Sequence, residues 1–174
     1  YSGHGDSPLT IEERSSAQHL EEVLAVFDWA KIKKEKGKFF VFGSSYGGFL
    51  ATHLSQQRDF DILTLQAPAI YRPSDFDVTY KNEDDQKTFD FRRNPAELSK
   101  HPLLKNAAKF QGKVLLIVHQ RDERIPKEVP DVYANAFNCK VILENVPHSL
   151  GQATKEEAAH YNQVVVDWIK DNLT

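Results

Sequence analysis

The order of its short apolar runs most constrains the fold of this chain. Residues 39–42, 62–65, 114–118 and 141–143 are apolar. The first of these runs lacks the alternation of a half-exposed strand, which predicts a strand buried on both faces. Segments with helical periodicity separate the runs. Strands that alternate with helices form βαβ units, so the pattern predicts the α/β fold class, with a parallel sheet and helices on both faces.

Capping boxes predict the starts of two long helices. Thr10 with Glu13 precedes the first helix and Thr154 with Glu157 precedes the last, because Ser or Thr followed three residues later by Glu satisfies exposed amides. Gly37 predicts the end of the first helix, since glycine readily takes the left-handed conformation. The apolar stripes recur at three- and four-residue steps: Leu20, Val23, Leu24, Phe27 and Ala30 in the first helix, and Tyr161, Val165, Trp168 and Ile169 in the last.

One segment interrupts the alternation of strands and helices. Residues 68–112 form a long connection that carries several aromatic side chains among many charges. Long connections of this kind often cover an active site, which favours a lid. The alternative is a loop whose aromatic side chains pack against the body. We expect residues 1–174 to form a single domain, with 68–112 as a short lid-like insertion.

Charge and cysteine content argue against several functions. The formal net charge of −3 gives no footprint for nucleic acid. No apolar stretch approaches the roughly 20 residues that span a bilayer and no signal peptide is visible, so we expect no membrane contact and a cytoplasmic location. Cys139 is the single cysteine and is expected to be a buried, reduced thiol. The histidines lack metal-ligand spacing, and we expect no metal.

The most specific motif lies at residues 43–47, which read Gly-Ser-Ser-Tyr-Gly and are followed by Gly48. This G-x-S-x-G pattern falls between a predicted strand and a predicted helix, where a sharp turn would hold Ser45 strained with its hydroxyl exposed. Bulky side chains two residues on either side would clash in that turn. The amide of Tyr46 could donate to a developing oxyanion. Ser44 occupies the x position, and its side chain should point away from the exposed turn.

A serine hydroxyl is a poor nucleophile at neutral pH and needs a base that an acid orients. Asp122 follows the strongest predicted strand and His148 follows the last one, at the strand ends where catalytic groups gather. The chain order Ser, Asp, His is the order expected for a nucleophile elbow. We therefore predict Ser45, Asp122 and His148 as a catalytic triad. Glu123 is the alternative acid, whereas His119 as base would violate the chain order.

Together these motifs resemble the α/β-hydrolase superfamily, in particular small esterases, thioesterases and acyl-peptidase-like members. This resemblance implies that the chain hydrolyses a carboxylic ester, thioester or acyl-peptide bond of a small-molecule or peptide substrate, without a cofactor. The segments that carry it are residues 1–7, similar to a D-x-R-G-x-G-x-S turn but with Ser2 where arginine is common, residues 43–48, residues 67–69, residues 121–126 and residues 146–149.

The resemblance also implies a departure from the family's usual sheet. That sheet normally has eight strands, and the first motif of this chain matches the turn after the fourth, so we expect a domain without its N-terminal strands. The loop that normally gives a second oxyanion donor would then be missing, with His4 and Gly5 as an alternative. We expect a missing N-terminal segment or a second copy to pair with the edge from Phe39 to Phe42. A non-catalytic binding or scaffold protein on the same fold is the alternative function.

Overall fold

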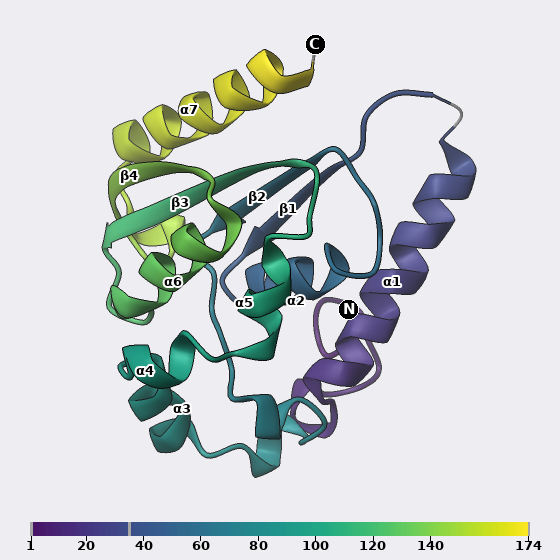
Figure 1. Cartoon of the computed structure of the whole chain (residues 1–174), viewed down its shortest axis with the longest axis vertical. Helices are drawn as coiled ribbons and strands as arrows, with labels where there is room; N and C mark the ends of the chain where they lie inside the picture. The colour runs from purple at the N-terminus through teal and green to yellow at the C-terminus, as the bar shows by residue number, and fades with distance from the viewer. Residues whose placement is uncertain (1, 35, 174) are drawn as a thin grey trace.

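The computed structural model describes residues 2–34 and 36–173, and the side chains of residues 2–34 and 36–172. Within these ranges the chain forms one parallel sheet of four strands, and the spatial order of the strands follows the chain order (Figure 1). The predicted α/β class is therefore confirmed. The strands are β1 Phe40–Ser44, β2 Ile62–Gln66, β3 Lys113–Arg121 and β4 Lys140–Pro147.

Helices cover both faces of the sheet, as the pattern predicts (Figure 1). Alternate residues of β3 face opposite sides: Leu116 belongs to the larger core cluster, while Leu115 and Ile117 pack with Tyr161 and Val165 of the last helix. The helices on the larger core are α1 Ser16–Lys33, α2 Tyr46–Leu54, α5 Pro102–Ala107 and α6 Glu128–Phe137, and the helix on the other face is α7 Lys155–Leu173.

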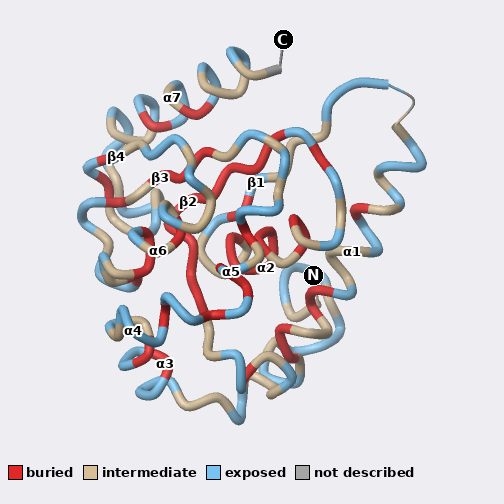
Figure 2. The backbone as a smooth tube through the Cα atoms, viewed as in Figure 1, coloured by how far each residue is buried: buried red, intermediate tan, exposed pale blue. Residues whose placement is uncertain are grey.

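The segment from 68 to 112 is folded rather than an open loop, and Figure 1 shows most of it below the carboxyl ends of the strands. Local capping explains its short helices, because Asp84 and Asn94 accept hydrogen bonds from amides three residues on. Leu98 and Leu103 are buried in the larger core cluster (Figure 2). Besides α5, the segment contains the 3-10 helices η2 Pro73–Asp75 and η3 Tyr80–Asn82 and the helices α3 Asp85–Arg92 and α4 Pro95–Leu98.

The predicted capping box at Thr10 is wrong. Thr10 precedes a 3-10 helix, η1 Ile11–Glu13, and its side chain makes no capping hydrogen bond. The box of α1 is formed by Ser15 and Gln18, whose side chains each accept from the other's amide. The reason is tertiary, because Ser15 bridges Thr79 and the preceding carbonyl accepts from the amide of Tyr80. Backbone pairing with a distant segment thus keeps the chain extended where local sequence favours a helix.

The other predicted ends of the long helices agree better with the structure. Thr154 and Glu157 form the predicted box before α7, with N–H···O distances of 2.8 and 3.2 Å. A second 3-10 helix, η4 Leu150–Gln152, precedes it. At its other end α1 stops at Lys33 and is followed by Gly37 in the loop, with a positive φ of 105°. Glycine therefore ends up in the left-handed region as expected, but beyond the cap residue.

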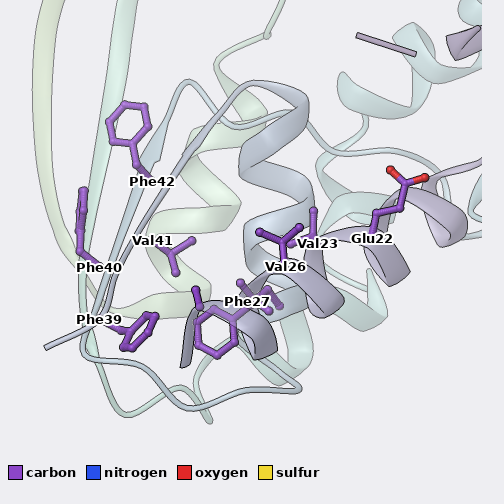
Figure 3. A pocket seen from close by; sticks show the side chains of 10 residues that line it. Glu22, Val23, Val26, Phe27, Phe39, Phe40, Val41 and Phe42 are labelled. Carbon is purple, nitrogen blue, oxygen red and sulfur yellow. The ribbon is translucent and has the colours of Figure 1, made fainter. Parts of the chain in front are cut away.

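Strand β1 corrects the prediction of a strand buried on both faces. It lies at one edge of the sheet, no described residue pairs with its outer side, and Phe42 is 44% exposed. An apolar groove of about 380 Å³ runs between β1 and α1. Figure 3 shows Val23, Val26 and Phe27 of the helix facing Val41 of the strand across it. Across the described ranges, no helix is long and apolar enough to cross a membrane.

Candidate active site

Ser45 sits in a strained turn between β1 and α2. Its backbone angles are φ 50° and ψ −116°, a combination that non-glycine residues rarely adopt. Hydrogen bonds fix this conformation from both sides: the Ser45 amide donates to the carbonyl of Gln66 at 2.9 Å, and its carbonyl accepts from the amides of Gly48 and Ala69 at 3.0 and 2.9 Å. The neighbouring strand and the segment after it therefore hold the serine in place.

Two of the three glycines around Ser45 are required by close packing. A Cβ on Gly43 would lie 2.6 Å from the carbonyl oxygen of Gly47, and a Cβ on Gly48 would lie 2.8 Å from the Cβ of Pro68. A Cβ on Gly47 would meet nothing within 4 Å. The expected clash on both sides of the serine is thus correct for Gly43 and wrong for Gly47, because the second crowded position is one residue later.

The three residues of the predicted triad lie together at the carboxyl ends of their strands. Ser45 Oγ is 3.0 Å from His148 Nε2, and His148 Nδ1 is 2.7 Å from Asp122 Oδ2. The other carboxylate oxygen, Oδ1, accepts from the amides of Arg124 and Ile125, both at 2.8 Å. The side chains of His148 and Asp122 are only 9% and 5% exposed. Every hydrogen-bonding atom of this row has a defined partner.

The hydrogen bonds around Asp122 determine which protons are present. Burial alone would raise the pKa of Asp122, but the hydrogen bonds from His148 and from the amides of Ile125 and Arg124 outweigh it, and the pKa lies below its usual value. An ionised carboxylate accepts hydrogen bonds only, so His148 must carry its proton on Nδ1. His148 Nε2 is then free to accept the hydroxyl proton of Ser45, which is the arrangement of a general base.

The rival residues lie elsewhere. Glu123 is exposed and lies 3.9 Å from Arg124, its neighbour along the chain. His119 is buried and bonds to the carbonyl of Pro147 and the hydroxyl of Tyr161. Ser44 is an exposed residue at the end of β1, while His148 contacts Ser45. The direction of the Ser44 side chain stays a prediction.

Tyr46 is the first residue of α2, so its amide belongs to the turn whose N–H groups point beyond the helix N-terminus. Its side chain leads to a residue that sequence reasoning missed. The Tyr46 hydroxyl lies 2.8 Å from His19 Nδ1, and His19 Nε2 donates to the carbonyl of Ser2 at 3.1 Å. His19 is fully buried, and burial lowers its pKa. The signal was available, since His19 lies four and eight residues before Val23 and Phe27 on the apolar stripe.

Aromatic rings of the 68–112 segment reach the residue next to the serine. The rings of Tyr71 and Tyr80 each lie 5.5 Å from the ring of Tyr46, both edge-on. This spacing is favourable for aromatic pairs. The segment therefore contributes to the wall beside Ser45, although it enters the chain far from it.

Metal and thiol chemistry have little support around these residues. Among the residues that the structure describes, no group of three or more His, Cys, Asp or Glu side chains could hold a metal ion. Cys139 is half-buried, and burial raises the pKa of its thiol. This environment favours the protonated, less reactive form of the thiol.

Comparison with solved structures identifies the fold. The monoacylglycerol lipase of Paleococcus ferrophilus is similar with a TM-score of 0.69 and 17% identity, over 99% of this chain and 81% of the lipase. An alpha-beta serine hydrolase homologue from Coxiella burnetii has a TM-score of 0.63 and 13% identity, over 96% of this chain and 65% of the homologue. At these identities the similarity establishes the α/β-hydrolase fold and no more.

A larger enzyme contains the same unit. The acylaminoacyl peptidase of Pyrococcus horikoshii matches with a TM-score of 0.66 and 14% identity over 94% of this chain, but the chain spans only 29% of that peptidase. No curated protein sequence matches the chain. Residues 8–165 match the model of one sequence family, described as an uncharacterised protein family, UPF0227.

Proposed function

Because the chain belongs to the uncharacterised protein family UPF0227 and has the α/β-hydrolase fold, we propose that it is a serine hydrolase that cleaves a carboxylic ester, thioester or acyl-peptide bond. One observation carries this proposal: the continuous row from Ser45 Oγ through His148 to Asp122, with contacts of 3.0 and 2.7 Å. A serine so close to an oriented imidazole is the geometry of an activated nucleophile.

The first half of the proposed reaction forms an acyl-enzyme. Ser45 Oγ attacks the acyl carbonyl carbon while its proton passes to His148 Nε2, and the carbonyl oxygen becomes an oxyanion. The amide of Tyr46 would donate to that oxyanion at the N-terminus of α2. When the bond to the leaving group breaks, the leaving group takes the proton from His148. Asp122 remains ionised throughout and stabilises the imidazolium.

The second half returns the enzyme to its starting state. Water attacks the acyl carbon, gives a proton to His148 Nε2 and forms a second oxyanion. The bond to Ser45 Oγ then breaks, the serine recovers its proton from the imidazole, and the carboxylic acid leaves. These residues supply all the proton transfers of the cycle, so the proposal needs no cofactor.

The wall beside the serine favours an apolar or aromatic substrate group. Tyr71 and Tyr80 lie against Tyr46, and we assign the 68–112 segment the role of a lid-like insertion in a single domain. The similar structures described as a monoacylglycerol lipase and an acylaminoacyl peptidase support acyl transfer in general. They do not distinguish an ester from a peptide leaving group.

Active-site labelling tests the proposal directly. A fluorophosphonate probe should attach to Ser45 of the folded protein, which peptide mapping would locate. Ser45→Ala should abolish labelling, while the matched control Ser44→Ala should keep it. Absence of labelling in folded wild-type protein, or attachment to another residue, would refute the proposal.

A binding or scaffold role on the same fold is the second candidate. The observation that favours it is the apolar groove between α1 and β1, which is lined by Val26 and Phe27 and lies apart from the triad residues. This candidate expects folded protein that neither labels nor turns over esters. The labelling experiment therefore separates the two functions.

A further inference from the structure

His119 connects the strand that carries the acid to the loop that carries the base. It lies in β3, is 4% exposed, and its Nδ1 is 2.9 Å from the carbonyl oxygen of Pro147. That carbonyl belongs to the peptide bond that joins Pro147 to His148. The carbonyl of His119 in turn accepts from the amide of Asp122 at 3.3 Å. One residue thus contacts both partners of Ser45 through their backbones.

A bulge explains why the base loop needs this contact. His119 pairs with Glu144 and Arg121 pairs with Pro147. The step is 121 − 119 = 2 residues on β3 and 147 − 144 = 3 residues on β4, so β4 carries one extra residue. A bulge interrupts the ladder of backbone hydrogen bonds. Side chains of β3 replace the lost partners: Arg121 Nη2 donates to the carbonyl of Asn145 at 2.9 Å, and His119 donates to that of Pro147.

The imidazole of His119 has only one arrangement that fits its surroundings. Burial lowers the pKa of His119, so the ring is neutral and carries one proton. A carbonyl accepts only, and Nδ1 must therefore hold that proton. Nε2 then accepts from the hydroxyl of Tyr161 in α7, at 3.3 Å, where the two rings stand edge-to-face at 89°. Neither nitrogen is available to the hydroxyl of Ser45.

We propose that His119 is a positioning residue, which holds the base loop through the Pro147 carbonyl so that His148 stays within reach of Ser45. The inference rests on the proposed hydrolase function. Its effect is expected in the rate of the chemical step, because displacing a reacting group by about 1 Å costs roughly 100-fold in rate. Substrate binding involves other parts of the site and should change little.

Two near-isosteric variants separate positioning from bulk. In His119→Asn the amide nitrogen takes the place of Nδ1 and can still donate to Pro147. In His119→Gln the amide lies near the place of Nε2 and faces Tyr161 instead. With p-nitrophenyl butyrate as substrate, we expect His119→Ala and His119→Gln to lower kcat about ten- to 100-fold with KM within about twofold, and His119→Asn to stay within about threefold of wild type.

A stability control and a substrate-free readout complete the experiment. Val165→Ala thins the same small core on α7 and should lower the thermal midpoint without changing kcat. In NMR spectra, the Nδ1 proton of His148 should exchange with water faster in His119→Ala and His119→Gln, and at the wild-type rate in His119→Asn. Because this readout needs no turnover, failure of the hydrolase function and failure of this inference are distinguishable.

Three results would overturn the inference. The first is equal loss of kcat in the Asn and Gln variants, and the second is unchanged kcat and proton exchange in His119→Ala. The third is a loss of kcat that follows the thermal midpoint in Val165→Ala as in the His119 variants, which would reduce His119 to a structural role.

Discussion

The two sides of β1 present opposite solutions to the same problem of satisfying buried groups. At its carboxyl end Ser45 meets His148 and Asp122, whose side chains are 9% and 5% exposed and fully hydrogen-bonded to one another and to backbone amides. Along its outer edge no described residue pairs with the strand, and Phe42 is 44% exposed. The site end is polar and complete, whereas the edge is apolar and open.

This difference shows that the candidate site is assembled without the outer side of β1. Its hydrogen bonds come from β2, from the loops after β3 and β4, and from the start of α2. The open edge instead offers backbone groups and apolar surface to another chain segment. Changes at one region should therefore leave the other largely intact, and the following experiments test that separation in order of expected effect.

The largest effect is expected from the nucleophile and the base. Ser45→Ala and His148→Ala should each reduce ester turnover by a factor on the order of 10⁴ or more, and the double variant should be scarcely worse, because the residues act as a unit. Steady-state kinetics on purified variants would measure this. If the two losses multiplied, the residues would be acting independently and the proposed triad would be wrong.

Next in size is the effect of the acid. Asp122→Asn should lower kcat by a factor on the order of 10²–10⁴, because an amide no longer fixes the Nδ1–H tautomer of His148. Glu123→Gln is the matched control, one residue along the chain and exposed, and it should stay within about twofold. A reversed pattern would move the acid to Glu123.

The glycines of the elbow test how far the site depends on backbone packing. Gly48→Ala places a Cβ against Pro68 and should destabilise the protein by about 1–3 kcal/mol through overpacking. Gly47→Ala meets no atom within 4 Å and should change the free energy of unfolding far less. Urea unfolding of both variants would measure the difference, and equal losses would contradict the packing argument.

The smallest effect on activity is expected at the edge, where we propose pairing with an N-terminal segment or a second copy. Phe42→Lys should reduce concentration-dependent association in sedimentation experiments while ester turnover stays within about twofold. Leu143→Lys is the control on the opposite edge, because Leu143 is 60% exposed but lies on a strand that already carries Lys140 and Glu144. Protein that stays monomeric at every concentration would exclude the second copy.

The parts of the structure that sequence predicts well are those determined by local chemistry. The strand–turn–helix geometry at Ser45 follows from glycine spacing, and the Thr154 box follows from a four-residue pattern. The placement of Asp122 and His148 follows from the rule that parallel strands share one carboxyl edge. Each of these depends on few residues, and the strand order that unites them is the order of the chain.

The parts that sequence misses are those decided by distant contacts. The Thr10 box fails because Ser15 pairs with Thr79, 79 − 15 = 64 residues away. The roles of His19 and His119 depend on Tyr46 and Tyr161, which are 27 and 42 residues away. The exposure of β1 depends on which strands flank it. No local pattern records these partners, although the helical stripe does indicate that His19 faces inward.

The backbone pairing before α1 has a consequence for local unfolding. The Ala17 amide donates to the carbonyl of Phe76 at 2.9 Å and the Tyr80 amide donates to that of Arg14 at 3.0 Å, so two segments 80 − 17 = 63 residues apart share their hydrogen bonds. Neither amide can exchange its proton with solvent until these segments separate. The start of α1 and residues 76–80 therefore constitute one cooperative opening unit, and displacing the 68–112 segment here also frees the N-terminus of the helix.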